Sequence, residues 1–282
     1  MNILITGSNG QLGSEIRHLA ETHSQHHYYF TDVADLDITQ AQETMAYCQK
    51  NKIELIVNCA AYTAVDQAED EPELAMRINA TAVENLAQTA KRLQAKVIHI
   101  STDYVFDGTA NTPYTTEHPT APQSVYGMTK LKGEEKLLEL LPDSIIIRTA
   151  WLYSSYGQNF VKTMLRLGRE RDSLQVVFDQ VGSPTYAADL AQAIMEIINQ
   201  DCKVGGIFHF SNEGVCSWYD FAHSIMKKKG LDCQLSPVDS SAFPSKATRP
   251  NFSVLDKKRI KESYHIKIPH WEDALDTCLK LL

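Results

Sequence analysis

The feature that most constrains the fold is a run of three glycines directly after the first apolar segment. Residues 2–6 read Asn-Ile-Leu-Ile-Thr, and Gly7, Gly10 and Gly13 follow at every third position. An apolar segment this short predicts a buried strand, and the stretch after Gly10 predicts a helix. Glycines between a strand and a helix allow a tight turn and leave the first helical amides free to bind an anion. The spacing predicts a dinucleotide-binding βαβ unit.

Two further features support dinucleotide binding. Asp32 follows the second predicted strand about 20 residues after Gly13, where a carboxylate binds the adenosine ribose in such units. Small residues follow the third predicted strand, where a cofactor passes close to the backbone. Because no Arg or Lys follows Asp32 closely to meet a 2′-phosphate, we expect NADH, with NADPH as the alternative. The predicted cofactor contacts are Gly7, Asn9, Gly10, Gln11, Leu12, Gly13, Asp32, Ala60, Ala61 and Tyr62.

The first half of the chain alternates short apolar segments with longer amphipathic stretches. The predicted strands are residues 2–6, 28–31, 54–58, 96–101 and 144–148. The predicted helices between them are residues 12–22, 40–51, 73–93 and 124–141. This alternation is typical of α/β folds, and almost continuously apolar strands indicate a parallel sheet covered on both faces. We therefore predict a doubly wound parallel sheet of the Rossmann type.

The pattern becomes less regular after Arg148. Loop sequences interrupt it, and further helices are predicted at residues 159–170, 187–200, 217–229 and 271–282. We expect a dinucleotide-binding Rossmann domain over residues 1–149. Residues 150–282 are expected to form mainly a smaller, substrate-binding lobe, with some of its elements returning to the first domain. The two parts would meet at a cleft.

Charge and composition indicate which classes of partner the protein can bind. A net charge of −8 argues against a general nucleic-acid binder, which would present a basic face. No apolar run approaches the roughly 20 residues that cross a bilayer, so no membrane partner is expected. The first residues show no basic leader with a cleavage site, so a cytoplasmic location is expected. The six cysteines lack metal-ligand spacing, which predicts reduced thiols and no metal site.

Tyr126 and Lys130 lie four residues apart in a predicted helix, which places them on one face. A phenol, whose ordinary pKa is about 10, exchanges protons near neutral pH only if its phenolate is stabilised. A unit charge at ~4 Å, with an effective dielectric of ~20, contributes about 4 kcal/mol, which is sufficient. The spacing alone also occurs on ordinary solvated helices. The other motifs favour a site, because Thr102 and Asp103 end a strand at the edge where such sheets bind ligands.

Several of these motifs resemble the extended short-chain dehydrogenase/reductase superfamily. They are the Gly7-x-x-Gly10-x-x-Gly13 loop, the segments Ala60–Asp66 and Ser101–Gly108, and Tyr126-x-x-x-Lys130. Motifs further along the chain are similar to one branch of it, the dTDP-4-dehydrorhamnose reductase family. These are Arg148–Tyr153, Asp179–Thr185, Arg249-Pro250 and Ser253–Leu255. The resemblance covers nearly the whole chain.

The resemblance implies an NAD(P)H-dependent enzyme that reduces the C4 ketone of dTDP-4-dehydro-β-L-rhamnose to dTDP-L-rhamnose, a precursor of cell-surface polysaccharide. It makes Tyr126, Lys130 and Thr102 catalytic. Tyr126 would protonate the nascent alkoxide, Lys130 would lower the tyrosine pKa and bind the nicotinamide ribose, and both would contact the cofactor. The substrate contacts that it implies are Thr102, Asp103, Trp151, Gln180, Gly182, Thr185 and Arg249.

Two other functions stay open from the sequence. A relative of this family is the noncatalytic regulatory subunit of methionine adenosyltransferase, which would use the glycine loop to bind a nucleotide structurally. Nucleotide-sugar epimerases share the glycine and Tyr/Lys motifs and retain their NAD through the reaction. The sequence leaves the oligomeric state open as well, with a homodimer among the options.

Overall fold

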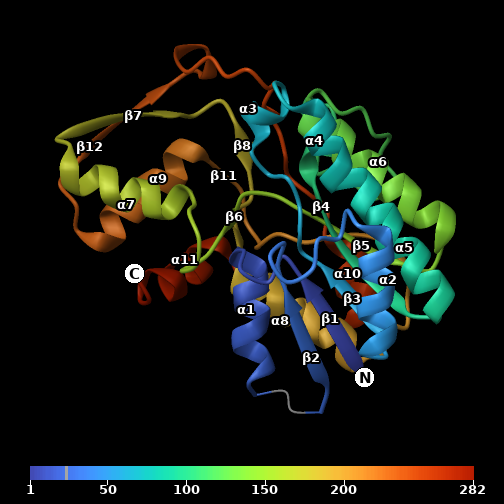
Figure 1. Ribbon diagram of the computed structural model, residues 1–282. Coiled ribbons are helices and arrows are strands. Elements are labelled where there is room, and N and C mark those ends of the chain that lie inside the picture. The colour runs from blue at the N-terminus through green and yellow to red at the C-terminus, as the bar shows by residue number, and fades with distance from the viewer. Residues whose placement is uncertain (23–24) are drawn as a thin grey trace.

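The computed structural model describes residues 1–22 and 25–282, and within them it contains a six-stranded parallel sheet flanked by helices (Figure 1). The sheet order is β10-β5-β4-β3-β1-β2, and every neighbouring pair is parallel. The strands are β1 (Asn2–Thr6), β2 (His27–Thr31), β3 (Leu55–Asn58), β4 (Lys96–Thr102), β5 (Ile145–Thr149) and β10 (Gly206–His209). The predicted doubly wound fold is confirmed. Because β2 and β3 lie on opposite sides of β1, the chain changes winding direction there, which opens a crevice at the carboxyl ends of the strands.

Two layers of helices cover this sheet, one on each face, because apolar side chains of the strands point to both faces. Ile3 and Ile5 of β1 belong to a buried cluster with residues of α1 (Gln11–Ala20), α8 (Ala187–Asn199) and α10 (Lys258–Tyr264). Leu4, between them, belongs to a second cluster on the opposite face. That face is covered by α2 (Ala41–Lys50), α5 (Ala82–Leu93) and α6 (Val125–Leu140). Successive strand side chains point to opposite faces, so a continuously apolar strand buries both.

The prediction of one continuous helix over residues 73–93 is wrong in detail. The structure divides this segment into α4 (Pro72–Met76), a π-helical turn η1 (Arg77–Thr81) and α5, with a short α3 (Val65–Ala68) before them. At the wider turn, α6 approaches so closely that a Cβ added at Gly133 would lie 2.1 Å from the carbonyl oxygen of Asn79. The Asn79 side chain also bonds the Tyr62 backbone at 2.9 and 3.1 Å and the Thr129 hydroxyl at 3.1 Å. The turn therefore anchors the loop after β3 to α6.

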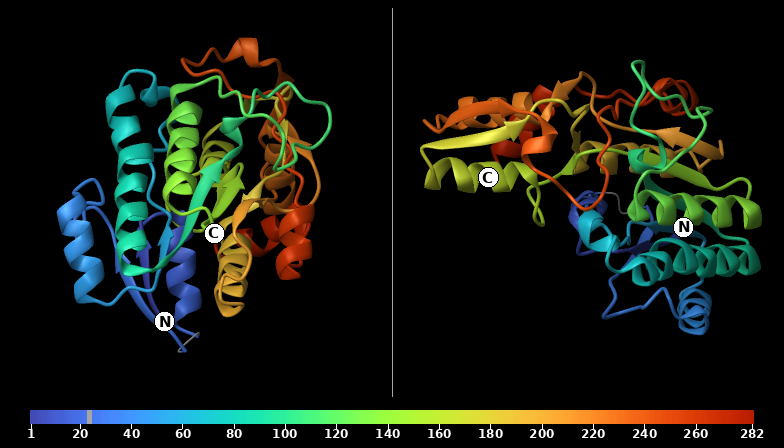
Figure 2. Two further views of the ribbon diagram at one scale, coloured as in Figure 1. Left: turned by 90° about the vertical axis from the view of Figure 1, so that its right-hand side faces the viewer. Right: turned by 90° about the horizontal axis from the view of Figure 1, so that it is seen from above.

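The remaining elements form a second group with a core of its own beside the carboxyl ends of the sheet strands (Figures 1 and 2). Its helices are α7 (Phe160–Glu170), α9 (Trp218–Lys229) and α11 (Trp271–Leu279). Its paired strands are β6 (Leu152–Tyr153) with β9 (Thr185–Tyr186), β7 (Ser173–Val177) with β12 (Gln234–Val238), and β8 (Val181–Gly182) with β11 (Cys216–Ser217). Short 3-10 turns complete the chain at η2 (Asp103–Val105) and η3 (Ser240–Ala242).

The chain beyond residue 149 thus contributes to both groups. Its α8 and α10 cover one face of the large sheet, and β10 extends the sheet beside β5. The sequence analysis did not predict β10, which is four residues long and lies between loops. Across residues 1–22 and 25–282, none of the helices combines the length and apolar composition needed to cross a membrane.

Candidate active site

A cavity of about 1080 Å³ lies at the carboxyl ends of β1, β3 and β4. Residues from the glycine loop, the three strand ends, α6 and the loop after β5 line it. The predicted site residues that it brings together are Gly7, Asn9, Gly10, Gln11, Leu12, Gly13, Asp32, Ala60, Ala61, Thr102, Asp103, Tyr126, Lys130 and Trp151. In the described part of the chain, the other predicted residues lie outside this lining: Tyr62, Gln180, Gly182, Thr185 and Arg249.

The glycine loop has the close backbone packing that a dinucleotide requires. Gly7 has a φ of +62°, and a Cβ there would lie 2.7 Å from the backbone of Ala60. A Cβ at Gly13 would lie 2.5 Å from the Gly7 carbonyl oxygen and from Ser8 Cα. Both positions therefore exclude a larger side chain, and α1 begins at the cavity with its first amides free of side-chain caps. This arrangement fits a pyrophosphate bound at the helix N-terminus.

Asp32 and Arg17 both contact Asn9 of the glycine loop, and Asp32 lines the cavity. The Asn9 backbone N–H donates to Asp32 Oδ2 at 3.1 Å. Arg17 donates to the Ser8 hydroxyl at 2.8 Å and lies 3.5 Å from Asn9 Oδ1, with its guanidinium 4.7 Å from the Phe30 ring centre. The sequence analysis considered only residues that follow Asp32 and named no cation for a 2′-phosphate, whereas the structure places Arg17 near Asn9. Arg17 comes from α1, one turn after Gly13.

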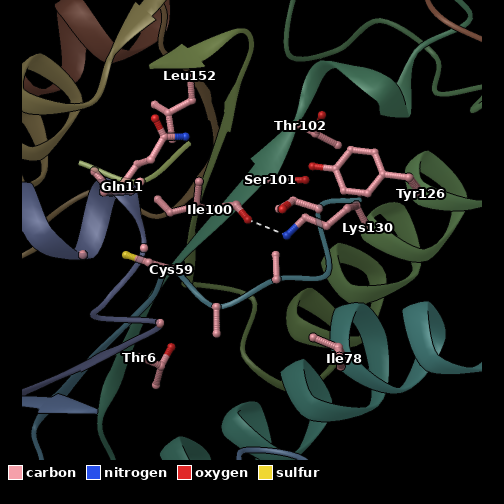
Figure 3. Close-up of a pocket in the computed structure, with 18 of the residues that line it drawn as sticks. Thr6, Gln11, Cys59, Ile78, Ile100, Ser101, Thr102, Tyr126, Lys130 and Leu152 are labelled. Carbon is pink, nitrogen blue, oxygen red and sulfur yellow. Dashed lines mark hydrogen bonds between the residues drawn. The ribbon is translucent and has the colours of Figure 1, made fainter. Parts of the chain in front are cut away.

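Tyr126 lies in the first turn of α6, which the Ser124 hydroxyl caps by accepting the Gly127 N–H at 3.1 Å. Gly127 permits close contact with η2, since a Cβ there would lie 2.2 Å from the Tyr104 carbonyl oxygen. The Tyr104 and Tyr126 rings meet edge to face at 5.4 Å. Figure 3 shows the Tyr126 hydroxyl directed toward Thr102 and Ser101 at the end of β4. These contacts fix the direction of the phenol.

Burial controls the ionisation of Tyr126 and its neighbours. It raises the pKa of Tyr126 to about 12, with a smaller opposing effect from a Thr102 hydrogen bond. The sequence analysis expected Lys130 to lower the pKa of Tyr126, and the structure does not show this effect. Burial also raises the pKa of Asp103 to about 7, against hydrogen bonds from Thr102 and Ser253 that lower it. The Thr102 hydroxyl donates to Asp103 Oδ1 at 3.0 Å, so the two predicted residues act as one hydrogen-bonded unit.

Lys130 extends into the cavity from the same side of α6 as Tyr126 (Figure 3). Its side chain is only 2% exposed, and Nζ donates to the Ile100 carbonyl oxygen at 2.6 Å. Burial lowers the pKa of Lys130 to about 8, and the nearby Glu134 partly opposes this change. The lysine therefore ionises within the range where enzymes are assayed, which a surface lysine does not do.

A buried ion pair connects α6 to the sheet. Arg148 of β5 donates to both carboxylate oxygens of Glu134, with contacts of 3.0, 3.2 and 2.6 Å. The Ser101 hydroxyl of β4 donates to the same carboxylate. Such a pair is worth little net stability but fixes geometry, because either charge left alone in the interior would be costly. It holds α6, and with it Tyr126 and Lys130, against β4 and β5.

Trp151 forms part of the cavity wall, at the start of the second group of elements. It adopts a φ of +50°, a left-handed conformation uncommon for a large side chain. Its ring stacks on Trp218 with centroids 3.6 Å apart. Gly182 makes room behind it, since a Cβ there would lie 2.8 Å from the Trp151 ring. The Thr185 hydroxyl donates to the Ala150 carbonyl oxygen at 2.6 Å, so Gly182 and Thr185 support Trp151 and its backbone.

The remaining predicted residues have partners outside the cavity lining. Arg249 donates to Asp66 of α3 at 2.7 Å, an ion pair in which both side chains are exposed. The Tyr62 hydroxyl donates to Glu71 at 2.7 Å, away from the cofactor position expected for it. Gln180 is buried, just before β8. The Tyr62 hydroxyl thus bonds to the segment between α3 and α4.

Sequence reasoning also missed two buried polar residues behind the cavity, Asn58 and His99. Asn58 ends the apolar strand β3, and His99 lies between Ile98 and Ile100 of β4. An amide and an imidazole in strands buried on both faces are unusual enough to have signalled a role. The helical spacing between Gly13 and Arg17 was a comparable signal, because residues four apart lie on one helix face.

Comparison with known proteins places this geometry in a family. A family model described as the RmlD substrate binding domain matches residues 1–282. A dTDP-4-dehydrorhamnose reductase of Aggregatibacter actinomycetemcomitans is 39% identical, over 97% of this chain and 96% of that protein. The chain belongs to the dTDP-4-dehydrorhamnose reductase family. The resemblance inferred from the sequence motifs is confirmed.

Solved structures of this reductase family agree with the fold. The crystal structure of a dTDP-4-dehydrorhamnose reductase from Clostridium acetobutylicum has a TM-score of 0.96 and 43% identity, over 100% of this chain and 99% of that one. A reductase from Bacillus anthracis, solved in complex with NADP, has a TM-score of 0.96 and 39% identity, with the same coverage. The Bacillus anthracis relative therefore binds NADP.

Proposed function

We propose that this chain reduces the C4 ketone of dTDP-4-dehydro-β-L-rhamnose to dTDP-L-rhamnose, within the biosynthesis of nucleotide sugars for cell-surface polysaccharide. The observation that carries the proposal is the convergence of the glycine loop, Thr102, Tyr126 and Lys130 on one cavity in a member of this reductase family. A cavity of about 1080 Å³ suits a dinucleotide together with part of a nucleotide sugar. We place the enzyme in the cytoplasm.

The glycine loop and Asp32 would hold the dinucleotide, which supplies the hydride when bound. Either NADPH or NADH fits the residues present. Asp32 provides the carboxylate for a free ribose 2′-hydroxyl, and Arg17 provides a guanidinium next to Asn9 for a 2′-phosphate. The NADP complex of the Bacillus anthracis relative supports NADPH use. Ala60 and Ala61 leave space for the cofactor beside the backbone of the loop after β3.

Tyr126 supplies the proton. With its pKa raised to about 12 the phenol is fully protonated at neutral pH, as a donor to a nascent alkoxide must be. The Thr102 hydroxyl would hold the carbonyl oxygen against the phenol, and Asp103 would bind a neighbouring sugar hydroxyl. Lys130 would bind the nicotinamide ribose and orient it toward the ketone. Each group thus touches the substrate or the cofactor from a fixed element of the sheet edge.

The second group of elements would bind the sugar and the nucleotide. Trp151 offers a flat apolar surface to the 6-methyl group of the sugar, and Trp218, Gly182 and Thr185 hold it in place. We propose Arg249 as a contact of the diphosphate, for which it would exchange its present partner, Asp66. Gln180 is proposed to border the nucleotide from the loop before β8. These assignments place the substrate between the two groups of elements.

The test is an assay of the purified chain with dTDP-4-dehydro-β-L-rhamnose and NADPH or NADH. We expect oxidation of the reduced cofactor in one-to-one ratio with dTDP-L-rhamnose, measured by absorbance and by mass spectrometry. Cofactor binding without turnover would instead indicate a noncatalytic nucleotide-binding subunit. Turnover with retained NAD and no added reductant would indicate an epimerase. The reductase activity named for the relatives favours the first outcome.

A further inference from the structure

Lys130 ends a buried chain of polar side chains that crosses three neighbouring strands. The Thr6 hydroxyl of β1 donates to Asn58 Oδ1 of β3 at 2.6 Å. Asn58 Nδ2 lies 3.0 Å from His99 Nδ1 in β4, and His99 Nε2 lies 3.4 Å from Lys130 Nζ. All four side chains are at most 2% exposed. Buried polar groups persist only when their hydrogen bonds are made, so the direction of each bond can be worked out.

The backbone decides which way the Asn58 amide points. The Ala60 backbone N–H lies 3.2 Å from Asn58 Oδ1, and a backbone N–H can only donate. A flipped amide would place its NH₂ group against this donor. The NH₂ group therefore faces His99, and His99 Nδ1 must be the acceptor.

The tautomer of His99 follows from this direction. Burial, together with the nearby Lys130, lowers the pKa of His99 well below its ordinary value, so the ring is neutral and carries one proton. Because Nδ1 accepts from Asn58, that proton is on Nε2, the nitrogen that faces Lys130. An ammonium group has only donors and is opposed by this N–H. An uncharged amine can accept from Nε2–H and still donate to the Ile100 carbonyl oxygen.

Two other ionisable groups act on Lys130 in the opposite direction, Glu134 of α6 and Cys59 after β3. Tyr126, from the same helix, is uncharged at neutral pH. Glu134 favours the ammonium form, but its carboxylate is already engaged by Arg148 at 2.6 Å. The net result is a lysine whose pKa burial lowers to about 8 despite Glu134 and Cys59. Of the two polar contacts of Lys130 Nζ, the Ile100 carbonyl oxygen accepts from either form, whereas the Nε2–H of His99 disfavours the charged one.

We propose that His99 is a positioning residue for Lys130: Asn58 holds it in the Nε2–H tautomer, and in that form it opposes the ammonium state and eases release of the lysine proton. The catalytic meaning of this arrangement rests on the function proposed above. When Tyr126 has given its proton to the new hydroxyl, an N–H bond of Lys130 breaks and the O–H bond of Tyr126 forms again. The resulting amine takes up one proton from the solvent, which is the proton that the reduction consumes.

The first test is the tautomer of His99 in the cofactor-free protein. Nitrogen NMR of histidine-labelled protein distinguishes Nε2–H from Nδ1–H, and a His99→Gln variant assigns the signal. We expect Nε2–H. A proton on Nδ1 would overturn the proposal without any need for a further variant. This measurement does not involve turnover, so its outcome is independent of the substrate.

The second test reverses the tautomer. Asn58→Asp keeps the size of the side chain and its acceptor for Thr6 and Ala60, but it turns the donor toward His99 Nδ1 into an acceptor. The ring proton should then move to Nδ1, leaving Nε2 to accept from Lys130. We expect the Lys130 pKa, measured from the Cε carbon shift of labelled lysine, to rise by at least one pH unit. An unchanged pKa alongside a reversed tautomer would overturn the proposal.

A charge control separates this effect from simple attraction between the added carboxylate and the lysine. The double variant Asn58→Asp with His99→Phe keeps that carboxylate and removes the imidazole. We expect it to give a clearly smaller rise than Asn58→Asp alone, and an equal rise would overturn the role of His99. Where wild-type protein shows the expected tautomer yet fails to reduce the keto-sugar, the proposed function fails and the positioning of Lys130 stands.

Discussion

Tyr126 and Lys130 project from adjacent turns of α6 into one cavity, and burial moves their pKa values in opposite directions, the phenol to about 12 and the ammonium to about 8. The cause is the same, because burial disfavours the charged form of each group. The phenol therefore keeps its proton throughout the usable pH range. The lysine gains or loses its proton within that range.

Replacing Tyr126 with Phe should remove the proton donor while keeping the ring that packs against Tyr104. We expect kcat to fall by at least ~100-fold, the smaller end of general acid catalysis. NADPH binding, measured by fluorescence, should change little. A kcat close to that of the wild type would show that another group donates the proton.

The pH dependence of kcat/KM should show a falling limb near pH 8. The lysine pKa is lowered, so the ammonium form is present below about 8 and is lost as the pH rises through that value. Tyr126, at about 12, does not contribute in this range. In Asn58→Asp the limb should move to higher pH, because that variant is expected to raise the pKa of Lys130. Wild-type activity that stays constant to high pH would contradict the assignment.

Asp103→Asn should stabilise the protein at pH 8 but not at pH 4.5. The buried carboxyl has a pKa raised to about 7, whereas an unfolded aspartate ionises near 4. Folded stability is therefore full at low pH and decreases as the pH rises through 7, since the charged form is disfavoured inside. We expect a gain on the order of 2–4 kcal/mol at pH 8. Urea unfolding at both pH values measures it, and equal gains would refute the ionisation argument.

Arg148→Met should destabilise the protein by about 3–5 kcal/mol, because it leaves the Glu134 carboxylate unpaired in the interior. The double variant with Glu134→Leu should recover most of this loss, since two apolar side chains can replace a buried pair. Thermal unfolding measures both. If the single variant is as stable as the wild type, water reaches Glu134 and the pair does not anchor α6.

The two residues beside Asn9 should control cofactor choice separately. Arg17→Gln should raise KM for NADPH by roughly 10–100-fold, which corresponds to one charge-assisted hydrogen bond, and leave KM for NADH unchanged. Asp32→Ala should weaken NADH binding and reduce discrimination against NADPH. Calorimetry with 2′,5′-ADP and 5′-ADP gives the same comparison without catalysis. Equal affinity of Arg17→Gln and wild type for 2′,5′-ADP would place the 2′-phosphate elsewhere.

Regular periodicity made the fold predictable from the sequence. The strands at residues 2–6 and 96–102 and the helices around α6 and α7 agree with the predictions to within a residue or two. The glycine spacing and the Tyr126/Lys130 pair located two parts of the cavity lining, because these motifs depend on local backbone geometry. The π-helical turn at η1 and the strand β10 were not predicted, since their conformations depend on contacts with α6 and β5.

The site residues that lie together in one segment could be predicted from the sequence. The contacts between residues of distant segments could not. Sequence alone determined the parallel sheet, the nucleotide-binding turn and the one-turn spacing of phenol and amine, since these follow from periods of two and 3.6 residues. Only the tertiary structure decided that Arg17 and Asp32 both contact Asn9, that Arg249 pairs with Asp66, and that Thr6, Asn58 and His99 connect to Lys130. The reason is physical: hydrogen bonds and burial join atoms that are adjacent in space, and a linear pattern does not contain those distances.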